Sequence, residues 1–184
     1  MDTFKRRRVL VFGLGLAVCQ FIAASAWAAD PAPSRGLPDQ WVTSQAYVVP
    51  KFTAPEGEGY FSIIEGLNKK LYIGTAAYGE NAFLVEFDPA EGSMTTVLDA
   101  HKAIGKDITG FGSQAKIHTR NNVGASGKIY FGTKQGYPNA TEKREDYPGG
   151  YPLVYDPKTG KTQVYDIPVP HHGIASITPD EARG

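Results

Sequence analysis

The stretch Lys70-Leu71-Tyr72-Ile73-Gly74-Thr75 returns 58 residues later as Lys128-Ile129-Tyr130-Phe131-Gly132-Thr133. Both copies place branched and aromatic side chains, which suit a pleated and half-buried strand, ahead of a glycine and a threonine. Similarity at a fixed internal period is typical of proteins built from stacked repeats. The sequence therefore predicts two related structural units, one around each copy.

Each copy lies within a set of four β-rich runs separated by Gly, Pro, Asn and Asp, which favour turns. One run precedes the quoted stretch, and two follow it. In the first unit these three runs are 60–64, 82–89 and 94–98, and in the second they are 115–119, 151–157 and 161–165. Each unit is therefore predicted to be four short strands.

The same turn occurs between the third and fourth runs of both units. Its sequence is Asp-Pro-Ala-Glu-Gly at 88–92 and Asp-Pro-Lys-Thr-Gly at 156–160. Aspartate can accept hydrogen bonds from the turn amides, proline sets its own backbone angle, and glycine takes a positive φ before the return strand. We interpret both aspartates as parts of hairpin turns and not as catalytic groups.

These units resemble the blades of secreted β-propellers, because of Gly-Lys-Ile-Tyr-Phe-Gly-Thr at 127–133 and Tyr-Asp-Pro-Lys-Thr-Gly at 155–160. YVTN, NHL and quinoprotein-like repeats are similar, as are the blades of virginiamycin B lyase and of oligogalacturonate and ulvan lyases. The resemblance covers residues 45–184 and implies an all-β fold of β-propeller repeats. It implies two complete four-stranded blades at 60–99 and 114–167, an outer clasp strand at 46–50, and the start of a further blade at 172–184.

Two whole blades are fewer than the four to eight of a closed ring. The count predicts an N-terminal fragment of a larger propeller, whose missing blades would complete the ring. The alternative is a short chain that closes its ring by self-association, as some lectins with two blades per chain do.

The N-terminus has the features of an export signal. Lys5–Arg8 are basic, 9–24 is apolar, and Ala26-Trp27-Ala28 offers a signal-peptidase site. We predict a signal peptide at 1–28, a flexible linker at 29–44, and a periplasmic or secreted protein. Both the general secretory route and the twin-arginine route remain open. No later apolar run is long enough to span a bilayer, so no membrane attachment is predicted after cleavage.

Loss of residues 1–28 removes four of the 19 basic and one of the 19 acidic residues, which leaves 15 against 18. This balance argues against a nucleic-acid partner. The same cleavage removes Cys19, the single cysteine, so no disulfide, thiol nucleophile or cysteine metal site is expected.

Histidines near the predicted inner strands are the candidate chemical groups. His118 and Arg120 are predicted to share one strand face and are the candidate catalytic pair. His171 and His172 precede the predicted inner strand of the third blade and are candidate metal ligands. In oligogalacturonate lyases, a resemblance at blade level only, a histidine-held metal ion binds the uronate carboxylate. The alternative is that the histidines only bond neighbouring loops and that Arg120 pairs with a loop carboxylate. His101 is expected at the surface.

The insertion 136–150 holds tyrosines beside charged residues. Tyr137, Tyr147 and Tyr151 could stack on sugar rings and line a carbohydrate groove, or the segment could be a solvated loop. The sequence therefore predicts an exported protein that presents a ligand-binding surface, with no defined reaction and no indicated cofactor. The first alternative is a polysaccharide lyase, in which His118 or the His171–His172 pair neutralises or deprotonates a uronate. The second is an oligomeric lectin.

Overall fold

The computed structural model describes residues 44–54 and 62–184. The chain divides into two units, Met1–Gln45 and Ala46–Gly184, and the description below concerns the second. The predicted signal peptide and almost all of the predicted linker lie outside the described residues, and so do residues 60 and 61 of the first predicted strand.

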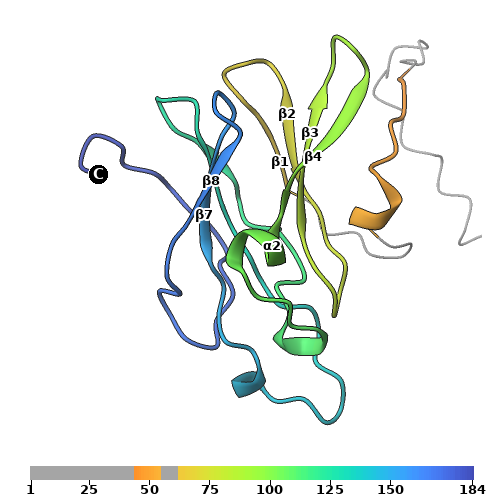
Figure 1. The fold of residues 1–184 in the computed structure, drawn as a ribbon, viewed down its shortest axis with the longest axis vertical. Helices are drawn as coiled ribbons and strands as arrows, with labels where there is room; N and C mark the ends of the chain where they lie inside the picture. Colours follow the sequence, from red (N-terminus) through yellow and green to blue (C-terminus); the bar gives the residue numbers. More distant parts are fainter. Residues whose placement is uncertain (1–43, 55–61) are drawn as a thin grey trace, which may run out of the picture. The chain divides into compact units, whose positions relative to one another are not determined.

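Two four-stranded antiparallel sheets form the fold, each with its strands in chain order (Figure 1). The first sheet contains β1 (Ser62–Glu65), β2 (Leu71–Gly74), β3 (Phe83–Asp88) and β4 (Ser93–Asp99). The second contains β5 (Asn122–Val123), β6 (Ile129–Gly132), β7 (Pro152–Asp156) and β8 (Lys161–Val164). The short helices are η1 (Lys51–Thr53), α2 (Ala100–Ile104), η2 (Gly110–Gly112) and η3 (Arg144–Asp146). The prediction of a mostly β chain with two four-stranded units is confirmed.

The strand register extends the 58-residue repeat to the two central strands. Tyr72 on β2 lies between Ile64 and Glu86, and Tyr130 on β6 lies between Asn122 and Val154. Positions on the second and third strands of the two sheets can therefore be matched, whereas β4 is displaced by a register shift between Leu84 and Val85 that the second sheet lacks. The predicted turns are also confirmed, since Asp88 and Asp156 each accept a hydrogen bond from the amide two residues later.

The predicted first strand of the second unit is wrong. Residues 115–119 form no strand, and β5 lies instead at Asn122–Val123. The segment is extended because the ends of both central strands bind its backbone. Ile117 donates its amide to the Thr75 carbonyl (3.0 Å), while Lys116 exchanges amide–carbonyl bonds with Lys134 at 3.0 and 2.9 Å. A segment that alternates apolar and polar residues is predicted to be a strand even when, as here, it only connects two sheets through isolated backbone hydrogen bonds.

A glycine at the end of each central strand allows this bridge to pack. A methyl group on Gly74 would lie 2.3 Å from the Ile117 carbonyl oxygen and 2.4 Å from its Cγ2. On Gly132 it would lie 2.5 Å from both Cβ and Cγ2 of Ile174. The same contact, in which an isoleucine packs on a glycine, therefore occurs twice, and the two glycines are 58 residues apart. We call it the glycine–isoleucine joint.

The hydrophobic core lies between the two sheets. The first sheet contributes one face of β2, β3 and β4, and the second contributes one face of β6 and β7. The principal residues are Tyr72, Leu84 and Leu98 from the first sheet and Ile129, Phe131, Leu153 and Tyr155 from the second. The rings of Tyr72 and Tyr155 lie 5.9 Å apart at an angle of 55°. The two sheets therefore pack with unlike faces in contact.

Helix α2 corrects the expectation for His101. Asp99 caps the helix by accepting a hydrogen bond from the Lys102 amide (3.0 Å), and Gly105 ends it with a φ of 75°. His101 is buried, and not at the surface, because its Nε2 accepts a hydrogen bond from the Gln114 amide at 3.2 Å. Its Nδ1 lies 3.3 Å from a carboxylate oxygen of Asp107.

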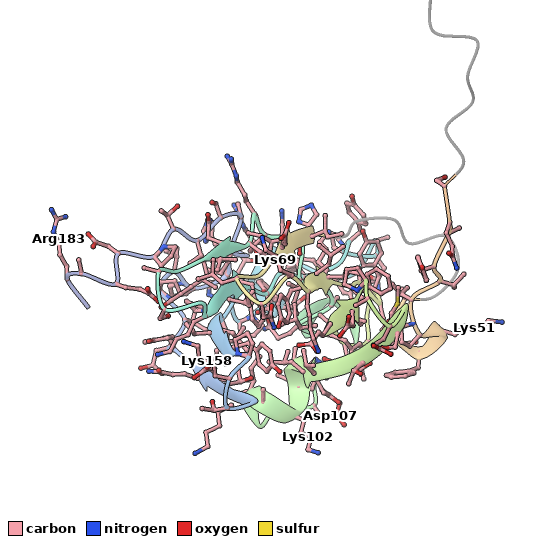
Figure 2. All side chains as sticks on the ribbon, turned by 90° about the horizontal axis from the view of Figure 1, so that it is seen from above. Lys51, Lys69, Lys102, Asp107, Lys158 and Arg183 are labelled. Atoms are coloured by element: carbon pink, nitrogen blue, oxygen red, sulfur yellow. The ribbon has the colours of Figure 1, made fainter. Side chains whose placement is uncertain are left out.

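The two ends of this unit lie on opposite sides of the sheets, as Lys51 on η1 and Arg183 near the C-terminus show (Figures 1 and 2). Residues 46–50, predicted as a clasp strand, have no strand structure. Tyr47 from this segment instead packs on Phe87, with ring centroids 4.6 Å apart. In 172–184, Ser176 forms one isolated parallel bridge with Arg120 and no strand follows.

Candidate functional site

An open pocket of about 610 Å³ lies where the first strands of the two sheets meet. Its volume falls in the range of pockets that hold small molecules. His118 and Arg120 both line it, together with Ser62, Ile63, Ile64, Thr119, Asn121, Asn122 and Ala175. None of these described lining residues is a carboxylate. The pocket therefore offers the guanidinium group of Arg120 and polar side chains from 118–122, which face β1 of the first sheet.

A buried hydrogen-bond network holds the polar side of this pocket in place. Ser62 donates its hydroxyl to the Ile117 carbonyl at 3.1 Å and accepts a bond from Asn121 Nδ2 at 2.9 Å. Thr119 donates to the amide oxygen of Asn121 at 2.8 Å. The Gly132 amide completes the chain by donating to the Thr119 hydroxyl at 3.1 Å. Because buried and fully bonded groups are rigid, the network fixes β1 against the start of β5.

Positive charge surrounds the imidazole of His118. Burial lowers the pKa of His118, and the ammonium groups of Lys116 and Lys134 lower it further. The ring is therefore neutral at neutral pH, and its neighbourhood has a positive potential. Arg120 adds an exposed guanidinium in the same pocket, and its backbone amide donates to the Ala175 carbonyl at 3.2 Å.

Tyr137 lies beside the same lysine that affects His118. Its ring is 64% exposed and meets the Tyr78 ring edge-on at 5.4 Å. The ammonium group of Lys116 lies 4.8 Å from the centre of each ring. Such cation–π contacts stabilise an ammonium group between two rings. Tyr137 and His118 are therefore neighbours of one buried cation.

Tyr147, in the insertion, and Tyr151, which follows it, are both buried. Tyr147 has no exposed surface, and its hydroxyl donates to Gln114 Oε1 at 2.9 Å. Burial raises the pKa of Tyr147 far above its ordinary value. Tyr151 is also buried, and its hydroxyl accepts a hydrogen bond from Lys106 Nζ at 2.8 Å. A fully buried ring offers no face to a sugar, so the predicted groove is reduced to Tyr137.

His171 and His172 bond the loops around them. His171 has a φ of 60°, and its Nδ1 lies 2.8 Å from the Tyr147 carbonyl oxygen. His172 Nδ1 lies 2.7 Å from the carbonyl oxygen of Pro170. Within 44–54 and 62–184, no three histidine, cysteine or carboxylate side chains are grouped to hold a metal ion. The structure places this pair apart from the His118 pocket.

The lysines and asparagines of this site were missed by the sequence analysis. The 58-residue spacing contains a usable signal, because Asn121 and Asn122 take the positions of Ile63 and Ile64. Polar residues where the first unit has apolar ones mark a change from packing to another role. Lys134 had no such signal, since its place beside Lys116 depends on the bridge between the sheets.

Comparison with protein-family models, with curated proteins and with solved structures finds no match. In the part of the chain that the structure describes, the helices are all too short or too polar to traverse a lipid bilayer.

Proposed function

We propose that this chain is an exported protein of the β-propeller type that binds a small anionic ligand, with the carboxylate of an acidic sugar as the favoured class. The observation that carries the proposal is the pocket shared by His118 and Arg120, which lies next to two lysines and has no carboxylate in its described lining. The two sheets match propeller blades in strand number, order and direction.

The donors of the pocket suit a carboxylate and a ring of hydroxyl groups. Arg120 can bind both oxygens of a carboxylate through its planar guanidinium group. The amide oxygen of Asn122 can accept a hydrogen bond from a hydroxyl group, while Asn121 holds the wall of the pocket through its bonds to Ser62 and Thr119. Ile63 adds an exposed apolar surface on the opposite sheet, against which the face of a sugar ring can lie.

One observation favours lyase chemistry at the same pocket. The lowered pKa of His118 keeps its imidazole in the neutral form, which is the form that accepts a proton. In this reaction His118 takes the proton next to the uronate carboxylate. The electrons of that C–H bond form a carbon–carbon double bond, and the glycosidic oxygen leaves and takes a proton from water.

Calorimetric titration with oligogalacturonate tests the binding proposal. We expect Arg120→Gln to weaken binding by about tenfold or more, because hydrogen bonds between charged groups contribute about 1.5–3 kcal/mol. Arg183→Gln is the matched control, since it removes the same charge from the exposed C-terminal tail. Equal affinity of Arg120→Gln and Arg183→Gln would remove the proposal.

The lyase candidate has a separate readout. The unsaturated product absorbs in the ultraviolet, so we expect polyuronate to develop absorbance with the native chain and not with His118→Ala. Binding without absorbance supports a binding protein. Absorbance that persists in His118→Ala rejects His118 as the base.

A further inference from the structure

The face through which the first sheet packs on the second has a counterpart on the second sheet. The register matches Tyr72 with Tyr130, Leu84 with Pro152 and Glu86 with Val154. It also matches Leu98 with Tyr165, whose amide bonds the Pro152 carbonyl at 3.0 Å. These four counterparts, Tyr130, Pro152, Val154 and Tyr165, all lie on the outer face of the second sheet, and we call them the docking face.

The docking face is apolar and partly exposed, with Val154 buried and Tyr130 and Pro152 half-buried. It lines a groove of about 300 Å³ whose rim is formed by the C-terminal residues Ile177–Glu181. Tyr165 is 46% exposed, although its counterpart Leu98 is buried in the core. Where the first sheet has Glu86, this face has Val154, so it is more apolar than the face that already packs within the chain.

The hydroxyl group of Tyr130 is already hydrogen-bonded, as is the hydroxyl group of Tyr72, its counterpart on the first sheet. The Tyr72 hydroxyl donates to Glu86 at 2.8 Å, and the Tyr130 hydroxyl donates to Glu181 at 2.7 Å. Glu181 also accepts bonds from the amide and the hydroxyl of Ser126 at 2.8 and 2.5 Å. A partner that covers the docking face therefore has to supply apolar contacts only.

The chain also has the complementary face. The core face of the second sheet consists of Ile129, Phe131, Leu153 and Tyr155, and the register matches these with Leu71, Ile73, Val85 and Phe87 on the first sheet. In the described residues, Tyr47 and Phe52 cover part of this face through ring contacts with Phe87 and Phe83. We call Tyr47 and Phe52 the cover.

The aromatic side chains of the cover are partly exposed, although Thr53 beside them is fully buried. Tyr47 and Phe52 remain 41% and 64% exposed. Within 46–54, the backbone hydrogen bonds of the described residues join residues of that segment to each other, as from the Thr53 amide to the Pro50 carbonyl at 2.8 Å. The described ring contacts on this face, which matches a sheet–sheet interface, therefore come from one short segment.

We propose that the docking face of one molecule binds the first sheet of a second copy of this chain, which displaces the cover. The contact repeats the internal packing of the first sheet on the second, with the same strand positions in the same roles. Because unlike faces meet, the association is head-to-tail and generates a closed ring or an open filament.

Sedimentation velocity of the exported full chain tests this inference over about a hundredfold range of concentration up to roughly 200 µM. We expect association at the upper end, and we expect Tyr165→Glu to weaken it by at least about tenfold, because it puts a charge into an apolar interface. Ala103→Glu on the exposed side of α2 is the control with the same charge change. Tyr165 is half exposed in the single chain, so its substitution is compatible with folding.

A second variant separates this arrangement from other dimers. Tyr47→Ala combined with Phe52→Ala uncovers the complementary face, and we expect it to strengthen association. The inference is overturned if the native chain and this double variant both remain monomeric at the highest concentration. It is also overturned if association is insensitive to Tyr165→Glu, or if loss of the cover leaves association unchanged.

Discussion

Gly132→Ala tests the joint between one repeat and the segment that follows it. The added methyl carbon would lie 2.5 Å from Cβ and Cγ2 of Ile174 and 2.9 Å from its Cγ1. Carbon atoms in contact are normally about 3.5–4.0 Å apart, so the methyl group intrudes by about 1 Å on several atoms at once. Overpacking of this kind costs about 1–3 kcal/mol. For a unit of this size we expect the melting temperature to fall by about 3–10 °C.

Thermal and urea unfolding of the chain, followed by circular dichroism, measures this loss. In the double variant Gly132→Ala/Ile174→Gly, the three side-chain atoms that block the methyl group are gone. We therefore expect a favourable coupling of about 1–2 kcal/mol in a double-mutant cycle.

Gly74→Ala provides the contrast. Its methyl group would meet the backbone carbonyl oxygen of Ile117 at 2.3 Å, so Ile117→Gly leaves an obstacle in place and restores less. A melting temperature of Gly132→Ala within about 1 °C of the native value, or no coupling with Ile174→Gly, would refute the steric account of the joint.

Three further predictions follow from buried or charged groups. Gln114→Leu removes a side chain that bonds Tyr147 and two other buried groups, so we expect urea unfolding to show a loss of about 2–5 kcal/mol. NMR titration of His118 should give a midpoint below 6.5, and Lys134→Gln should raise it because a repelling charge is lost. Hydrogen bonds from Ser126 and Tyr130 lower the pKa of Glu181 to about 2. Since this pKa is depressed, the tail anchor is intact above the unfolded value of about 4.3 and is lost as the pH falls through about 2. A fall in the protection of the Ser126 amide, measured as its exchange rate relative to that of an unstructured amide at the same pH, reports that loss.

The central strands and the hairpins were predictable because their determinants are local. Tyr72 and Tyr130 lie in short runs of branched and aromatic residues that end at a glycine. Asp88 and Asp156 form turns by accepting a hydrogen bond from the amide two residues later. Such signals need no distant partner, so a single sequence contains them in full.

The remaining elements depend on contacts between units. Residues 115–119 have the sequence pattern of a strand. Their backbone hydrogen bonds go to Thr75 at the end of β2 and to Lys134 after β6, so they do not pair as a strand with either sheet. His101 was predicted at the surface because nothing near it in the sequence indicates burial. Its hydrogen-bond partner in the core, Gln114, is thirteen positions away. Helix α2 did have local signals in Asp99 and Gly105, a capping aspartate and a left-handed glycine, and these could have predicted it.

Residues of the candidate site also differ in whether local sequence could predict them. His118 and Arg120 were predicted on one strand face, and they line one pocket although their segment is a bridge. Lys134 enters the site only through its backbone pairing with Lys116, which no spacing rule predicts.

The glycine–isoleucine joint gives this architecture a natural unit of exchange. Residues 117–174 begin with the isoleucine that covers Gly74 and end with the isoleucine that covers Gly132. A segment that starts at Ile117 and stops before Ile174 carries one isoleucine and one glycine of the joint, Ile117 and Gly132, so in a tandem copy the first isoleucine falls over the preceding glycine. Growth of such a protein by duplication is therefore limited by the faces of its outermost sheets and not by the connections between them.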